Sequence, residues 1–221
     1  TTLKTLMLAH NRLSDNGIKI LMQMLKKFDA LEELDVSANN IHSNGIADLC
    51  NAIQANMQIK SLNLSRNAAQ SEGFVYIMNM LLNNQSLEVL DVSSNKLKLE
   101  GVPQEYELSV NKNTTLRKLL LGNNLLYPAG MKILMQMVDK WNALEELDVY
   151  ANKIDDDAIA FLCDALKENM SITSLNLSSN HITGAGMVSI IDTLSKYTLP
   201  LNLGRIDLTF NHIEDKDISQ E

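Results

Sequence analysis

The ten residues ALEELDVSAN, from Ala30 to Asn39, return almost unchanged as ALEELDVYAN, from Ala143 to Asn152. Both segments carry the apolar skeleton L-x-x-L-x-L-x-x-N-x-L. Sliding this skeleton along the chain finds eight copies, which begin at Leu3, Leu31, Ile59, Leu87, Leu116, Leu144, Ile172 and Leu203. A repeat of about 28 residues cannot bury an apolar face alone, so consecutive repeats are expected to stack into one solenoid. We therefore predict a single domain over residues 1–221.

Each repeat reads as a strand, a turn and a helix. In the second repeat, Leu34 and Val36 alternate with Glu33, Asp35 and Ser37, which predicts a strand with one buried and one exposed face. Each skeleton has an asparagine at the turn that leaves the strand, and a buried amide there can satisfy backbone groups of the neighbouring turns. These ladder asparagines are Asn11, Asn39, Asn67, Asn95, Asn124, Asn152, Asn180 and Asn211.

A helical pattern follows each turn. In the second repeat Ile46, Leu49 and Ile53 recur at helical spacing, and the sixth repeat has apolar residues at the matching positions. Each strand is therefore expected to run parallel to the previous one. Three places depart from the pattern. Repeat three has Ala69 where leucine or isoleucine is expected, which predicts a small void. The other two are residues 101–113 around Pro103, where we predict an irregular helix, and the longer segment 197–201.

The eight copies resemble the leucine-rich repeat family over about residues 3–213. The period and the full helix are similar to the ribonuclease-inhibitor subtype of that family. The resemblance implies an α/β solenoid, a horseshoe with a parallel sheet on its concave face and helices on its convex face. That subtype alternates two kinds of repeat. Even repeats here carry Asp35, Asp91, Asp148 and Asp207, whereas odd repeats carry Met7, Asn63, Leu120 and Asn176 at that position.

The sequence also contains a longer duplication, which spans four of the 28-residue repeats. The hexapeptide KILMQM at residues 19–24 reappears at 132–137. Residues 1–113 and 114–221 therefore read as duplicated halves. The halves differ where Ser37 is replaced by Tyr150, and if their functions have diverged we expect the second half to bind the partner.

Composition excludes several classes of partner. The net charge of −8 disfavours a nucleic-acid groove, which needs clustered cations to neutralise phosphates. No apolar run approaches the roughly 20 residues of a membrane span.

Cys50 and Cys163 fall at equivalent positions of repeats two and six, too far apart for a disulfide. We expect free thiols and a reducing, cytoplasmic setting. The rival indication of secretion comes from N-x-S/T matches at Asn63, Asn84, Asn113, Asn169 and Asn176.

The outward strand positions form columns along the inner face, and these columns predict the binding surface. The first column alternates charge along most of its length, from Lys4 and Glu32 to Arg117 and Glu145, so lateral pairing is expected. Leu120, Tyr150 and Arg117 near the centre are the strongest candidate anchors. The full set of candidate partner-binding residues is Glu32, Asp35, Arg66, Val89, Asp91, Arg117, Lys118, Leu120, Glu145, Asp148, Tyr150 and Phe210.

No catalytic, cofactor-binding or metal-binding constellation is predicted. His181 and His212 occupy equivalent turns near residues 155–157, but their spacing matches no zinc motif, and the three aspartates fit a helix N-terminus. We predict a non-enzymatic module that binds one protein with a basic or mixed-charge patch on its concave face. Its oligomeric state stays open. The resemblance leaves alternatives, namely a Ran GTPase-activating regulator, an actin-regulatory array and a structural spacer.

Overall fold

The structure is a computed structural model that describes residues 2–25, 27–54, 56–99, 113–169, 171–196 and 202–214. The expected irregular helix around Pro103 and the longer segment 197–201 lie outside these residues. Eight parallel strands form one sheet in chain order from β1 to β8. The strands are Thr5–Met7 (β1), Glu33–Asp35 (β2), Ser61–Asn63 (β3), Val89–Asp91 (β4), Lys118–Leu120 (β5), Glu146–Asp148 (β6), Ser174–Asn176 (β7) and Arg205–Asp207 (β8).

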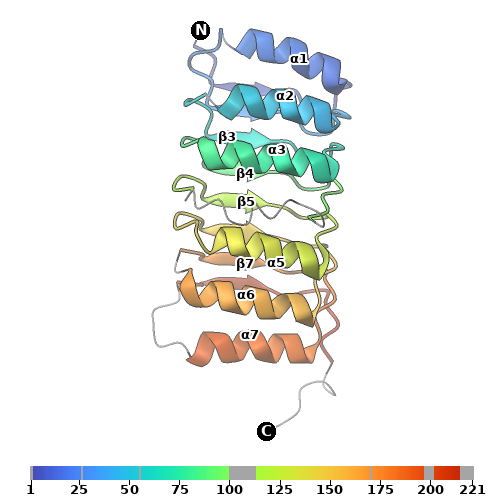
Figure 1. Cartoon of the computed structure of the whole chain (residues 1–221), viewed down its shortest axis with the longest axis vertical. Helices are drawn as coiled ribbons and strands as arrows, with labels where there is room; N and C mark the ends of the chain where they lie inside the picture. Colours follow the sequence, from blue (N-terminus) through green and yellow to red (C-terminus); the bar gives the residue numbers. More distant parts are fainter. Residues whose placement is uncertain are drawn as a thin grey trace.

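The described helices lie on one side of this sheet, and α1 and α7 lie at opposite ends of the stack (Figure 1). The helices are Ser14–Leu25 (α1), Ser43–Gln54 (α2), Gln70–Asn83 (α3), Tyr127–Val138 (α5), Asp156–Glu168 (α6) and Gly184–Lys196 (α7). Consecutive helices pack against each other, as α1 does on α2 and α5 on α6. The expected leucine-rich-repeat solenoid is therefore confirmed.

The buried core runs between the sheet and the helices. Leu31, Leu34 and Val36 are fully buried, as the skeleton predicts, and their equivalents in repeats three to seven are buried too. Trp141, the single tryptophan, is buried at the end of the α5 repeat. Every strand thus presents its leucine side to the helices and its variable side to the concave face.

The asparagine ladder is present as predicted, and its inner members are buried. Asn67 Oδ1 accepts hydrogen bonds from the backbone N–H groups of Asn39 and Ile41, each at 3.0 Å. Its Nδ2 donates to the carbonyls of Val36 in the previous repeat and Leu64 in its own. Each ladder asparagine from Asn39 onward therefore ties two turns together, which fixes the spacing of the strands.

The turn after this asparagine alternates between the two kinds of repeat. In repeats two, four and six, though not in repeat eight, the next residue has a positive φ, at Asn40, Lys96 and Lys153. In repeats one, three and five the positive φ falls three residues after the asparagine, at Ser14, Gln70 and Tyr127. The alternation that the sequence predicts at the strands therefore extends to the backbone of the turns.

Three predicted details were wrong or incomplete. Ser37 is buried rather than exposed, because the turns on both sides hydrogen-bond to its own turn. A methionine within the helical pattern is expected to pack in the core or between helices, yet Met24 is 48% exposed on α1. Asn84, Asn113 and Asn169, recognised in the sequence only as possible glycosylation sites, are buried. Their amides bind carbonyls of the preceding repeat and the N–H groups of their own turn, which makes a second ladder at the helix-to-strand turns.

Candidate protein-binding surface

Ion pairs cross the concave face between neighbouring strands. Glu32 lies between Lys4, with its Oε1 at 2.8 Å from Nζ, and Lys60, with its Oε2 at 4.0 Å. Hydrogen bonding to Glu32 raises the pKa of Lys4, and the same contact lowers the pKa of Glu32. The predicted lateral pairing in the first column is confirmed here. Exposed pairs of this kind add little stability, so their main effect is to neutralise the surface.

The same pairing recurs in the second half of the sheet. Arg117 on the approach to β5 pairs with Glu145, and Lys118 Nζ lies 2.8 Å from Glu146 Oε2. Arg117 and Glu145, both candidate binding residues, are therefore already partnered with each other. These two pairs therefore neutralise Arg117 and Lys118 at the centre of the face.

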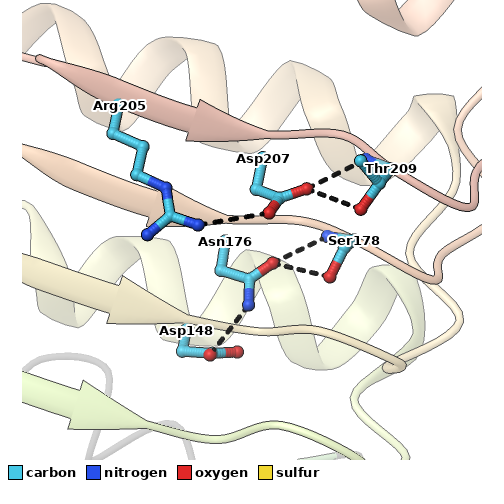
Figure 2. A network of polar contacts seen from close by, with 6 residues as sticks. All are labelled: Asp148, Asn176, Ser178, Arg205, Asp207 and Thr209. Carbon is cyan, nitrogen blue, oxygen red and sulfur yellow. Dashed lines mark hydrogen bonds and ion pairs between the residues drawn. The ribbon is translucent and has the colours of Figure 1, made fainter.

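The third column forms a polar network of its own (Figure 2). The carboxylate or amide oxygen of each polar residue accepts a hydrogen bond from the backbone N–H two residues later. This bond joins Ser37 to Asp35, Tyr150 to Asp148 and Ser178 to Asn176, at 2.8–3.0 Å. Asp35 and Asp148 thus have a structural role, since they hold the turn that follows their strands.

Lateral bonds link neighbouring repeats in this column. Asn176 Nδ2 donates to Asp148 Oδ2 at 2.9 Å, and Asn63 Nδ2 donates to Asp35 Oδ2 at 3.3 Å. Despite these bonds, burial raises the pKa of Asp148 above that of an ordinary carboxyl group. Asp207 shows the opposite shift, because hydrogen bonds from the Thr209 hydroxyl and backbone lower its pKa.

Leu120 interrupts this polar column. It is half-buried at the end of β5, in register with Asp91 of β4 and Asp148 of β6. Tyr150 follows β6 in the next column and is also half-buried. The two candidate anchors are therefore placed on adjacent repeats of the same face, as the columns predict.

Gly122 gives Tyr150 its place, and sequence reasoning missed this contact. A β-carbon on Gly122 would lie 1.9 Å from Tyr150 Cε1 and 2.1 Å from Cδ1, so the ring rests directly on the glycine. The first half has Ala9 and Ser37 at the equivalent positions. The paired change from alanine and serine to glycine and tyrosine was the signal that could have found the contact.

The remaining candidates do not form one cluster. Val89 on β4 is half-buried and in register with Lys118, so it belongs with Leu120 and Tyr150. Arg66 is exposed in the turn after β3. Phe210 is 86% exposed after β8, at the far end of the sheet from β1. The structure therefore brings together the candidates on β4 to β6, which we call the central patch: Val89, Asp91, Lys118, Leu120, Asp148 and Tyr150.

The histidines, cysteines and acidic residues outside the central patch were candidates for metal binding or thiol chemistry. Within the described ranges, no group of three or more histidine, cysteine, aspartate or glutamate residues is placed to hold a metal ion. His181 and His212 contact each other edge to face, with ring centroids 5.5 Å apart. Cys50 and Cys163 are buried free thiols, and burial raises the pKa of both. Among the helices described, none is long and apolar enough to cross a membrane.

A hollow of about 270 Å³ lies on the helical side, between α5 and α6. Its lining includes Met135, Phe161 and Ala165, with Asp139 and Asp164 among the polar residues. The Lys132 ammonium sits 5.7 Å from the centre of the Phe161 ring. This hollow is the alternative to the central patch as a contact site.

Comparisons with known proteins agree with the fold. A family model described as "Leucine Rich repeat" matches residues 1–22, 31–50, 83–102 and 168–190. A protein phosphatase 1 regulatory subunit 37 homolog of Caenorhabditis elegans is 33% identical over 95 residues, which are 41% of this chain and 10% of that protein. Human leiomodin-1 is 46% identical over 56 residues, 25% of this chain and 9% of that protein. The chain thus matches about a tenth of the length of these relatives.

A solved structure described as leiomodin-1 actin-binding site 2 superimposes with a TM-score of 0.51 at 17% identity. The match covers 79% of this chain and 86% of that one. At this identity the likeness bears on the fold alone. Eight registered repeats, one parallel sheet and four segments matched by that family model together show a leucine-rich-repeat solenoid fold.

Proposed function

We propose that this chain is a non-enzymatic protein-recognition module that holds one globular partner against the central patch. The observation that supports this most is the pair Leu120 and Tyr150, two large side chains in columns that otherwise carry mostly small or polar residues. Aromatic and aliphatic anchors among small neighbours are typical of protein interfaces.

The mechanism is rigid pre-organisation. Tyr150 is held by its backbone bond to Asp148 and by the ring contact on Gly122. Leu120 sits in a strand that is paired on both sides. Since these side chains are already ordered, they lose little additional conformational entropy when a partner binds.

The electrostatics fit a partner with a basic or mixed-charge surface. Arg117 and Lys118 are neutralised by Glu145 and Glu146, whereas Asp91 and Asp148 flank Leu120. We further propose a cytoplasmic setting, which the buried free thiols support. Helices of 12–14 residues and the alternating turns support the ribonuclease-inhibitor-like subtype.

Amide hydrogen exchange on a complex tests this proposal. A partner protein would be isolated on the immobilised chain, and exchange would then be compared with and without it. Slower exchange in the segments that carry β4 to β6 and their following turns supports the central patch. Protection confined to α5 and α6 would assign binding to the hollow between these helices and refute the proposal.

Actin is a second candidate partner class, favoured by the 46% identity with human leiomodin-1 over 56 residues. Co-sedimentation with actin filaments and calorimetry with monomeric actin test it directly. Binding that is weakened by changes at Leu120 and Tyr150 would make actin the protein held by the central patch. No binding in either assay would remove this candidate and leave the general proposal standing.

A further inference from the structure

The third column has three junctions where the aspartate of an even repeat meets the following odd repeat. At two of them the odd repeat supplies an asparagine, so Asn63 donates to Asp35 and Asn176 donates to Asp148. At the third junction the odd repeat supplies Leu120, in register with Asp91. Leucine has no donor, so Asp91 lacks the lateral bond that the other two aspartates receive.

Asp91 keeps its local bond, because its Oδ1 accepts from the Ser93 backbone N–H at 2.8 Å. On the other side, the amide of Asn63 is directed at Asp35. Within the part of the chain that the structure describes, no side chain donates to Asp91 Oδ2. This oxygen is therefore a free acceptor on a half-buried residue beside an apolar neighbour.

Glu88, immediately before β4, adds a second uncompensated carboxylate. Its first-column neighbours are Lys60 and Arg117, but Lys60 is directed at Glu32 and Arg117 at Glu145. Glu88 makes no ion pair with the described residues. Glu88 and Asp91 therefore bracket Val89, and Leu120 lies on the adjacent strand.

We propose that the partner places an arginine at the junction of Asp91 and Leu120, with its guanidinium on Asp91. An aliphatic side chain next to that arginine in the partner packs on Leu120 and Val89. A guanidinium offers several donors in a planar fork, tolerates partial burial and suits a carboxylate beside an apolar surface. This inference rests on the proposed function and deepens it, since it names one side chain of the partner and the residue that receives it.

The duplicated columns supply a variant that tests the inference without removing the acceptor. Leu120→Asn restores the asparagine found at the other two junctions, so its amide is expected to donate to Asp91 as Asn63 does to Asp35. The variant should fold normally, with a melting temperature equal to or above that of the natural chain. The substitution gives Asp91 Oδ2 a donor within the chain and removes the apolar side chain beside it at the same time.

The probe is the peptide acetyl-Leu-Arg-Leu-amide, followed by amide NMR spectra of the whole chain during titration. The control peptide carries citrulline, which has the shape of arginine without its charge. We expect shifts centred on Val89, Asp91 and Leu120, at least about tenfold weaker binding of the citrulline peptide, and loss of the shifts in Leu120→Asn. Leu120→Val, which keeps an apolar side chain without a donor, should retain them.

The outcomes separate the two proposals. Shifts spread equally over the acids of β2 and β6, or shifts that persist in Leu120→Asn, overturn the arginine site while the central patch stands. Equal binding of the arginine and citrulline peptides also overturns it. Shifts confined to the hollow between α5 and α6 overturn both the arginine site and the concave face as the contact surface.

Discussion

The ring of Tyr150 rests on Gly122, so closely that a β-carbon at position 122 would lie 1.9 Å from Cε1. In the first half of the chain the same two positions are Ser37 and Ala9. The halves therefore differ by a matched pair, in which removal of one methyl group makes room for one aromatic ring. The second half therefore carries an aromatic side chain on this face where the first half carries a serine.

Gly122→Ala should destabilise the fold by about 1–3 kcal/mol, because the added methyl group displaces the Tyr150 ring. Tyr150→Ser in the same chain should recover most of this loss, since the double variant reproduces the alanine and serine of the first half. Denaturant unfolding of the two single variants and the double variant measures the coupling. Additive effects would show that the ring does not rest on Gly122.

Asn67→Ala should cost at least about 2 kcal/mol of unfolding free energy. It leaves the buried N–H groups of Asn39 and Ile41 without an acceptor, whereas the carbonyls of Val36 and Leu64 keep a second asparagine donor. Asn11→Ala is the matched control at the same repeat position. Asn11 is exposed and donates only to the carbonyls of Leu8 and Ala9 in its own repeat. Equal losses in urea unfolding would contradict the stabilising role of the buried ladder.

Asp148 and Asp207 should titrate on opposite sides of the ordinary carboxyl pKa of 3.8. The raised pKa of Asp148 means that the folded chain binds its proton more readily than the unfolded chain, so Asp148 favours folding more as pH falls through its folded pKa towards 3.8. The lowered pKa of Asp207 stabilises the fold above pH 3.8, and that contribution disappears as pH falls through its folded pKa. Carboxyl NMR titration checks both directions, and a common pKa for the two groups would refute them.

Cys50 and Cys163 should resist alkylation in the native state at pH 8. Both thiols are buried, and burial raises the pKa of each, so the reactive thiolate is scarce. Mass spectrometry after iodoacetamide treatment should find both unlabelled natively and both labelled in guanidinium. Rapid native labelling of either cysteine would show that its helix opens readily or is packed differently.

The repeat in the sequence predicted the architecture because each leucine and ladder asparagine is defined by its position in a fixed period. The columns likewise predicted that Leu120 and Tyr150 share one face. Bonds between repeats were harder to predict. The sequence pattern places Asp35 and Asp148 on the outward side of their strands. It does not show that each carboxylate accepts a hydrogen bond from the backbone of its own turn and another from an asparagine side chain of the next repeat.

A short stretch of sequence also does not show which side chains a neighbouring repeat will bury. The hexapeptide KILMQM occurs twice, yet Met24 is 48% exposed and its equivalent Met137 only 7%. Identical letters differ because burial depends on what packs against the helix. In the same way, the N-x-S/T pattern at Asn84 gives no indication that its amide binds the carbonyl of Ile53.

The central claim is tested most directly by calorimetry on the double variant Leu120→Asn, Tyr150→Ser. The measurement compares its affinity with that of the natural chain for a partner protein that was isolated on the natural chain. Tyr76→Ser on the exposed side of α3 is the control for the loss of a surface tyrosine. We expect the double variant to bind at least about tenfold more weakly, as the loss of interface anchors implies, with a melting temperature close to that of the natural chain and unchanged binding by the control. Affinity of the double variant equal to that of the natural chain would contradict the central patch as the binding surface.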